Sequence, residues 1–187
     1  ILRDLDLLHS LAERGLCEVR VSLTTLDNRL KGQLEPRATA AATRLRVIRE
    51  MAARDIPVGV LTAPIIPFIN DHEMEAMLGA AADNGATSAD WVLLRLPHEV
   101  APLFREWLDR CYPDRADHVM NRIRDLRGGR DNSSAFGARM SGAGPLADLY
   151  RQRFQRQSRV LSLNTDDKKA LDTGQFRRPA GEQMGLI

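Results

Sequence analysis

Three short segments combine side chains that could bind a small organic ligand. Residues 22–27 carry hydroxyls and a carboxylate, which can hydrogen-bond a ribose or an amino-acid group. Residues 62–70 are apolar and contain two prolines, which stiffen the segment against a flat ring such as adenine. Residues 94–99 end in His98 and Glu99, a candidate base beside a carboxylate. Each segment also has a purely structural interpretation, as a helix cap, a buried apolar loop and a helix start respectively.

The remaining residues predict neither a metal site nor a phosphate loop. Cys17 and Cys111 are the only cysteines, which excludes a disulfide scaffold and a zinc or iron–sulfur site made from this chain's thiols alone. The four histidines have no metal-ligand spacing. The Arg-Gly-Gly-Arg segment at 127–130 lacks both the preceding strand and the following Lys-Ser/Thr of a phosphate loop.

Three strands must position the candidate segments. Alternating apolar residues predict a strand over 17–23, and continuous apolar runs predict buried strands at 57–62 and 91–94. Each is followed by a helical pattern, which is the β/α repeat of a parallel sheet with right-handed crossovers. Ligands bind at the carboxyl ends of such strands, so the candidate segments are expected at one edge of the sheet. Three strands cannot close an eight-stranded barrel, and they leave an apolar edge that needs a neighbour.

Helical periodicity predicts helices over residues 3–14, 39–54, 100–111, 114–126 and 146–163. Asp27 is expected to cap a short helix that ends near residue 34, and Asn70 and Glu73 have the spacing of a capping box before the next helix. A polar, glycine-rich loop is expected over 131–145. The predicted organisation is a β/α part over 1–99, a helical extension over 100–163 and an extended tail over 164–187.

The composition fits one globular domain, with 187 residues of which 43% are hydrophobic and 28% charged. A net charge of +2 does not by itself indicate a polyanionic partner. Few cysteines and no apolar run long enough to span a bilayer fit a protein of a reducing cytoplasm. The chain begins at Ile1 inside a helical pattern, so we expect it to be a piece of a longer protein.

Several segments, in this order, resemble a known family. They begin with Val-Arg-Val-Ser-Leu-Thr-Thr-Leu-Asp at 19–27 and Glu-Pro-Arg-Ala-Thr at 35–39, and continue through 56–73, 92–97, 104–108, 127–130 and 136–140. The series resembles the second half of a radical S-adenosylmethionine (SAM) protein, in the bacterial family related to spore photoproduct lyase. The resemblance covers nearly the whole chain.

The resemblance implies the carboxyl-terminal part of a partial (β/α)6 barrel, in an enzyme whose [4Fe–4S] cluster binds and reduces SAM. The resulting 5′-deoxyadenosyl radical abstracts a hydrogen from the substrate, and the related lyase implies a role in DNA-lesion repair. The implied SAM contacts are Ser22 and Thr24 with the ribose or methionine part, Arg37 with the carboxylate, Ala63, Pro64, Ile65 and Ile66 with adenine, and Leu96 closing the pocket.

The chain departs from the family pattern in lacking the Cys-x3-Cys-x2-Cys segment that holds the cluster. Two cysteines 94 positions apart cannot replace it, because the cluster needs three close thiolates. We therefore expect the chain alone to bind no cluster and to be inactive, and to need the amino-terminal half of the same protein as its partner.

A different interpretation is a non-catalytic α/β module that binds nucleic acid through the basic segment 120–159. The residues that would contact phosphates are arginines, namely Arg122, Arg124, Arg127, Arg130, Arg139, Arg151, Arg153, Arg156 and Arg159. The same arginines could instead form a solvated helical face. Separately, the terminal residues Gln183 to Ile187 resemble a peptide that docks DNA-repair proteins on the sliding clamp, although apolar terminal residues can also dock on their own fold.

Overall fold

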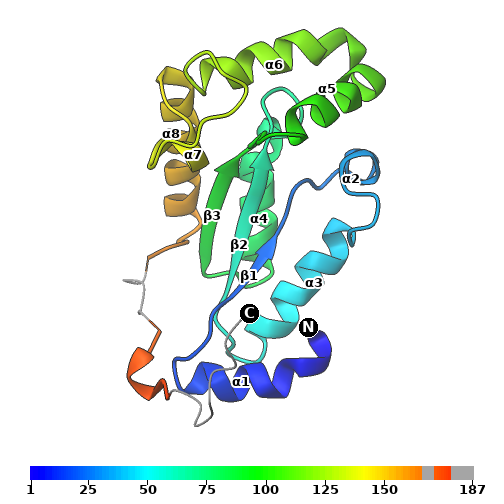
Figure 1. Ribbon diagram of the computed structural model, residues 1–187. Coiled ribbons are helices and arrows are strands. Elements are labelled where there is room, and N and C mark those ends of the chain that lie inside the picture. Colours follow the sequence, from blue (N-terminus) through cyan, green and yellow to red (C-terminus); the bar gives the residue numbers. More distant parts are fainter. Residues whose placement is uncertain (166–170, 178–187) are drawn as a thin grey trace, which may run out of the picture.

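The computed structural model describes residues 1–165 and 171–177, and its centre is a three-stranded parallel sheet (Figure 1). Strands β1 (Val19–Ser22), β2 (Val58–Ile65) and β3 (Ser88–Leu93) lie in the order β1-β2-β3, which is their order in the chain. The predicted α/β class and the three predicted parallel strands are confirmed. β2 runs three residues further than expected, through a cis Ala63–Pro64 peptide bond, and its pairing with β3 shifts register between Thr62 and Ile65.

Eight α-helices are described, and they include every helix that the sequence predicts. They are α1 (Leu5–Glu13), α2 (Asn28–Leu34), α3 (Ala41–Ala52), α4 (Met74–Asp83), α5 (Val100–Cys111), α6 (Ala116–Asp125), α7 (Ala138–Ser141) and α8 (Pro145–Val160). Short 3-10 helices at Leu2–Asp4, Asp71–Glu73, Pro113–Arg115 and Thr173–Gln175 complete the described structure. None of the described helices is both long enough and apolar enough to cross a membrane.

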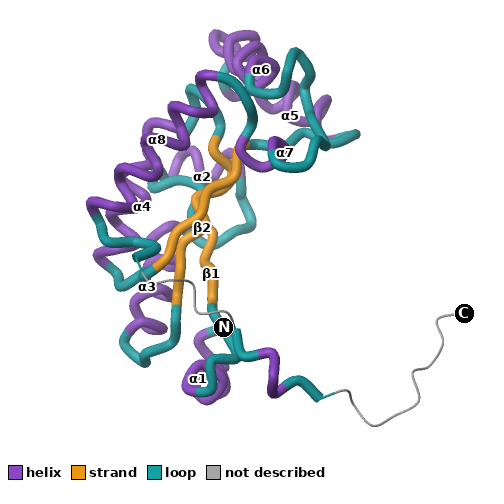
Figure 2. Tube along the Cα trace, turned by 90° about the vertical axis from the view of Figure 1, so that its left-hand side faces the viewer, coloured by secondary structure: helices purple, strands orange, loops and turns teal. Residues whose placement is uncertain are grey.

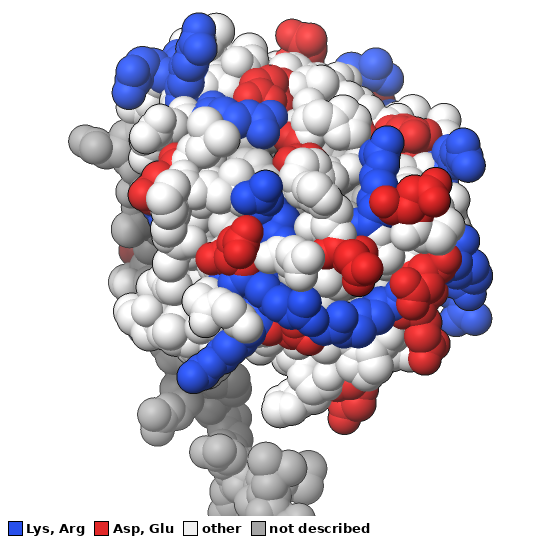
Figure 3. Space-filling model, turned by 90° about the horizontal axis from the view of Figure 1, so that it is seen from above, with Lys and Arg blue, Asp and Glu red and all other residues white. Residues whose placement is uncertain are grey.

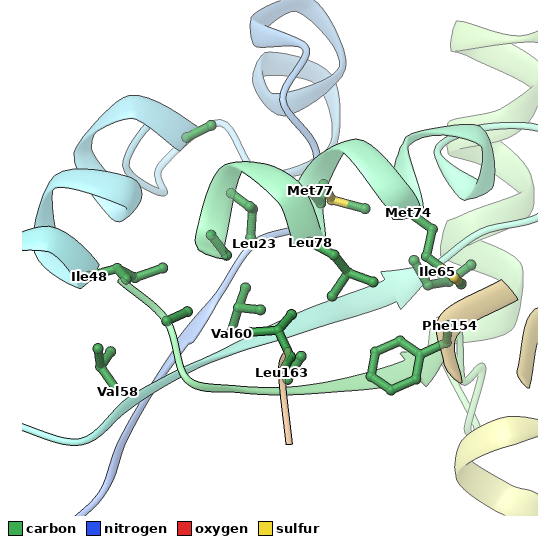
Figure 4. Packing of buried hydrophobic residues seen from close by; sticks show 14 of the residues in the cluster. Leu23, Ile48, Val58, Val60, Ile65, Met74, Met77, Leu78, Phe154 and Leu163 are labelled. Carbon is green, nitrogen blue, oxygen red and sulfur yellow. The ribbon is translucent and has the colours of Figure 1, made fainter. Parts of the chain in front are cut away.

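The main hydrophobic core lies between one face of the sheet and helices α3, α4 and α8. These three helices lie on the same side of the strands in Figure 2. Met74, Met77, Leu78 and Ala81 recur at helical spacing on α4 and are fully buried, and Figure 4 shows α4 packed along the strands. Burial of this apolar stripe is the main force that holds the helices on the sheet.

A second hydrophobic core covers the carboxyl ends of the strands. Its strand-end residues are Ile66, Ile69, Leu94 and Leu96. Against them pack residues of α2, α5 and α6, namely Leu30, Phe104, Trp107, Leu108, Val119, Met120 and Ile123. Because this core joins residues on both sides of position 100, the helical extension is packed directly on the β/α part.

Apart from the four-residue helix α7, which contacts the carboxyl end of β3, no described helix covers the other face of the sheet (Figure 2). Alternation along the strands and the register place Arg20, Gly59 and Ser88 on one row of this face, and Ser22, Leu61 and Asp90 on the next. Arg20 reaches over Gly59 to form an ion pair with Asp90, and its Nη2 lies 3.0 Å from Glu18 Oε1. The amino-terminal half of this open face is therefore charged.

The two edges of the sheet differ. The outer edge of β3 is closed by Asn164, whose side-chain amide donates to Ala89 O and whose Oδ1 accepts from Ala89 N, both at 3.0 Å. No described strand pairs with the outer edge of β1, where Arg44 Nη1 donates to Ser22 O at 3.0 Å. The sequence-based expectation of an edge that needs a neighbour therefore applies to β1.

Helix α8 is fixed to the β/α part by polar contacts as well as by the core. The Tyr150 hydroxyl donates to Asp71 Oδ2 at 2.7 Å. The Arg153 guanidinium makes a two-point ion pair with Glu75, at 2.8 and 2.6 Å, and donates to Asp71 O. This hydrogen-bonded pairing lowers the pKa of the Glu75 carboxyl, and burial raises the pKa of Tyr150, which stays protonated.

Candidate functional site

The loops that follow the three strands meet at the carboxyl edge of the sheet, where the sequence places the candidate site. Asn70 joins the first two of these loops and is fully buried. Its side-chain amide donates to Thr24 O at 2.7 Å and to Pro64 O at 2.9 Å, and its Oδ1 accepts from Ile66 N at 2.7 Å. All three contacts are to backbone groups, so Asn70 sets the course of both loops.

Asn70 was expected to cap a helix, and that prediction is wrong because its side chain makes no capping hydrogen bond. Glu73 is also engaged elsewhere. Its two carboxylate oxygens accept from the Thr25 hydroxyl at 2.7 Å and from Leu26 N at 2.6 Å, and so fix the loop after β1. The cap predicted at Asp27 is confirmed, since Asp27 Oδ1 accepts from Arg29 N at 2.7 Å.

Of the eight residues predicted to contact SAM, Ser22, Ala63 and Pro64 are accessible at the carboxyl end of the sheet. Ser22 is exposed, and Ala63 and Pro64 are half-buried. Ser22 is in register with Leu61, and alternation puts Ala63 on the same open face. The row that holds Ser22 also contains Leu61 and Asp90, so Ser22 and Ala63 are the small side chains on this part of the face.

Four other predicted residues point into the protein. Ile65 belongs to the main core, and Ile66 and Leu96 belong to the second core, with at most 1% of each exposed. Thr24 is 3% exposed and donates its hydroxyl to Ala63 O at 3.1 Å. These four side chains can shape the edge of the sheet, but within the described chain they are not accessible to a ligand.

Arg37 lies in an exposed turn after α2, and its side chain makes no hydrogen bond or ion pair with a described residue. The arginine that does reach β1 is Arg44, which donates to Ser22 O and Thr39 O and pairs with Glu35 Oε2 at 2.7 Å. Arg44 sits in a helix rich in arginine, so its sequence position alone did not distinguish it.

Arg127, which the sequence analysis proposed as a phosphate contact, has a structural role at the end of β3. It is 4% exposed and donates to four backbone oxygens, those of Leu93, Leu94, Ala138 and Arg139. No described carboxylate pairs with it, and burial together with the charge of Arg95 lowers its pKa. Arg127 thereby attaches α7 to the carboxyl end of β3.

The donor set for a [4Fe–4S] cluster is not present. Cys17 and Cys111 are both half-buried, and Cys17 Sγ donates to Leu8 O at 3.3 Å. Burial raises the pKa of the Cys17 thiol, which opposes the thiolate form that a cluster needs. No group of His, Cys, Asp and Glu suited to a metal ion occurs in the described ranges. Cluster chemistry is therefore not assigned to residues of this chain.

A cavity of about 480 Å³ lies between α2, the 3-10 helix Asp71–Glu73 and the segment 111–115. Its walls include Arg29, His72, Tyr112 and Arg115, together with the carboxylates of Asp27, Glu73 and Asp114. None of the eight residues predicted to contact SAM lines it. Its charges are mixed, so its lining indicates no single class of ligand.

Five of the nine arginines proposed to contact phosphates are already engaged. Arg127 is buried, and ion pairs hold Arg122, Arg124, Arg151 and Arg153 to Asp125, Asp131, Asp148 and Glu75 respectively. Seen from above, Lys and Arg side chains lie among Asp and Glu side chains (Figure 3). Arg130, Arg139, Arg156 and Arg159 are exposed and have no hydrogen bond or ion pair from their side chains to a described residue. The proposed clamp-binding residues Gln183 to Ile187 lie outside the described residues.

Comparison with known proteins finds relatives that carry no functional name. Uncharacterized protein Mb2609c of Mycobacterium bovis and uncharacterized protein Rv2578c of Mycobacterium tuberculosis are each 29% identical over 126 residues, which is 66% of this chain and 36% of the relative. Uncharacterized protein ORF301 of Acidianus two-tailed virus is 36% identical over 104 residues, 53% of this chain and 33% of the viral protein. The chain spans about a third of the length of these relatives. No family model matches the chain, and no solved structure matches it significantly.

Proposed function

We propose that this chain forms the carboxyl-terminal part of the partial barrel of a radical SAM enzyme and supplies one wall of its SAM site. The observation that carries the proposal is the winding of the sheet. The strands follow one another in chain order, and α3 and α4, which connect them, lie on one face. A doubly wound sheet reverses its strand order and carries helices on both faces, whereas a β/α barrel has the arrangement seen here.

The open face supports the same proposal. Parallel sheets normally have both faces buried, so a face that carries only the short helix α7 at one end needs a further layer. In a barrel that layer is the remaining strands and the ligand they enclose. The relatives are about three times as long as the segment they share with this chain, which leaves length for such strands. They would pair with the outer edge of β1, where no described strand lies.

The accessible residues at the carboxyl half of this face are suited to hold a nucleoside. The Ser22 hydroxyl can hydrogen-bond a ribose or an amino-acid group, and Ala63 and Pro64 leave room for a flat ring. Arg37 has no partner among the described residues and can bind a carboxylate. The four buried residues of the predicted set would not touch SAM and would only shape the loops around it, namely Thr24, Ile65, Ile66 and Leu96. SAM would supply the radical chemistry that the family resemblance implies, on a cluster held elsewhere in the protein.

The proposal is tested by SAM affinity in the full-length protein, prepared without oxygen and measured by equilibrium dialysis. Ala63→Leu places a larger side chain on the open face, and we expect SAM affinity to fall at least tenfold. Ala53→Leu makes the same change at the exposed end of α3 and should leave affinity unchanged. Thermal unfolding checks that each variant is folded. Equal SAM affinity in the wild type and both folded variants would contradict the placement of SAM on this face.

A further inference from the structure

A loop at the carboxyl end of β3 presents an exposed aromatic ring and two arginines that have no hydrogen bond or ion pair from their side chains to a described residue. The loop comprises residues 128–144 and includes α7. Arg127 anchors it, donating to Leu94 O and Arg139 O at 2.7 Å and to Ala138 O at 3.0 Å, while Ala143 N donates to Leu126 O at 3.0 Å. In Figure 2, α7 lies on the side of the strands opposite α4 and α8, which is the side of the open face.

Phe136 is the most exposed large apolar side chain described, with 94% of its surface accessible. Arg139 lies over its ring, with the guanidinium carbon 5.8 Å from the ring centroid. A phenylalanine exposed to this extent does not contribute to stability by burial in a hydrophobic core of the described chain. The guanidinium covers one face of this ring platform, and the other face is open to a planar group that can stack on it.

Two further arginines belong to this region of the chain: Arg130 lies in the same loop, and Arg95 follows β3, to whose end Arg127 attaches the loop. We use the term loop surface for Arg95, Arg130, Phe136 and Arg139. All three of its arginines are exposed and form no hydrogen bond or ion pair from their side chains with a described residue. The carboxylate next to them in the chain, Asp131, is held by Arg105 and Arg124, which lower its pKa. The loop surface therefore carries excess positive charge.

We propose that the loop surface binds single-stranded nucleic acid, with an unpaired base stacked on Phe136 and phosphates contacted by Arg95, Arg130 and Arg139. Aromatic rings combined with unpaired cations are the features by which proteins bind single strands. A duplex keeps its bases stacked and does not offer one to an exposed ring. A free nucleotide would need an enclosing pocket, and the cavity beside α2 is lined by none of these residues.

This inference does not depend on SAM chemistry, since none of the four residues of the loop surface is among the eight residues proposed to contact SAM. Helix α8 offers matched controls within the same basic segment. Arg156 and Arg159 are also exposed and without partners among the described residues, but no described aromatic ring is stacked with either. Phe176 is a similarly exposed ring, 78% accessible, on a different part of the molecule.

The test is fluorescence anisotropy of the full-length protein with a 5′-labelled 12-nucleotide DNA single strand at several salt concentrations. Phe136→Ala is expected to weaken binding about 5- to 100-fold, and Phe136→Trp to restore it. Each of Arg95→Gln, Arg130→Gln and Arg139→Gln should weaken binding and reduce the slope of log affinity against log salt by about 0.7. The double variant Arg156→Gln/Arg159→Gln and Phe176→Ala should bind like the wild type.

Three kinds of result would overturn the proposal. One is the absence of binding at low salt. Another is binding that the variants of the loop surface change no more than the controls do, which would indicate general attraction of a polyanion to arginine. The third is equal or tighter binding of the corresponding DNA duplex, or full competition by adenosine monophosphate at equal nucleotide concentration. Loss of SAM binding in a protein that still binds the single strand would count against the proposed function alone.

Discussion

Asn70 is the side chain on which the geometry of the candidate site depends most. Asn70→Ala removes three hydrogen bonds and leaves Thr24 O, Pro64 O and Ile66 N without their partner. A buried backbone group that loses its partner costs about 1–3 kcal/mol. Since the loops can relax and such terms are not additive, we expect the free energy of unfolding to fall by about 3 kcal/mol in total.

Asn70→Asp separates the donor role of Asn70 from its acceptor role. The carboxylate still accepts from Ile66 N, but it cannot donate to Thr24 O and Pro64 O and instead repels both oxygens. We therefore expect this variant to be at least as unstable as Asn70→Ala. Asn84→Ala is the control, because Asn84 donates a single hydrogen bond, at 2.8 Å to Ala80 O near the end of α4, and its loss should cost about 1 kcal/mol.

The assay is urea unfolding of the full-length protein followed by circular dichroism, with hydrogen exchange at the Ile66 amide as a local readout. The Ile66 amide should exchange faster in Asn70→Ala and stay protected in Asn84→Ala. If Asn70→Ala lost no more stability than Asn84→Ala, or if Asn70→Asp were as stable as the wild type, the role given to Asn70 would be refuted.

Further predictions concern the sheet and α8. A Cβ at Gly59 would lie 2.2 Å from Ser88 Oγ and 2.9 Å from Ser88 O, so Gly59→Ala should lower the free energy of unfolding by about 1–3 kcal/mol in urea titrations. Gly32→Ala, in α2 with open space around it, should instead stabilise by up to about 1 kcal/mol, and destabilisation as large as that of Gly59→Ala would contradict the steric explanation. Because Arg153 lowers the pKa of Glu75, this pair stabilises the fold above the unfolded pKa of the carboxyl and loses that effect as pH falls through the folded value. Urea unfolding between about pH 6 and pH 3 should therefore show a smaller loss of stability in Glu75→Gln than in the wild type, and parallel curves would exclude this contribution.

Local sequence patterns were sufficient to predict the strands, most of the helices and the Asp27 cap. These features depend on residues within a few positions of one another, as in the apolar run of β2 or the stripe on α4. Their ends moved by a few residues because hydrogen bonding to neighbouring strands, as at the register shift after Thr62, sets where a strand stops.

The site residues that sequence missed depend on contacts between distant segments. Asn70 meets Thr24 across 46 positions, and Arg127 meets Leu94 across 33 positions. Local spacing predicted that Asn70 caps a helix. Its side chain instead bonds to the backbone of the loop after β1 and of its own loop. The family resemblance implied that Ile66 and Leu96 contact SAM, but α5 and α6 pack over them and bury them in the second core.

Contacts between distant residues also made the segment after residue 163 differ from its prediction. An extended segment was expected from residue 164 onward, yet the Asn164 side chain exchanges two hydrogen bonds with the backbone of Ala89. Asp172 N donates to Gly15 O at 2.9 Å near the short helix Thr173–Gln175. Neither contact has a local signature, because each forms between residues more than 70 positions apart.

The most direct test of the proposed function is the detection of 5′-deoxyadenosine in the full-length protein. The protein would be purified without oxygen, loaded with iron and sulfide, reduced with dithionite and mixed with SAM, and the product measured by liquid chromatography and mass spectrometry. We predict 5′-deoxyadenosine in amounts at least stoichiometric with the loaded cluster. A full-length protein that carries a complete [4Fe–4S] cluster and forms no 5′-deoxyadenosine, or one that lacks three closely spaced cysteines and holds no cluster, would contradict the proposal.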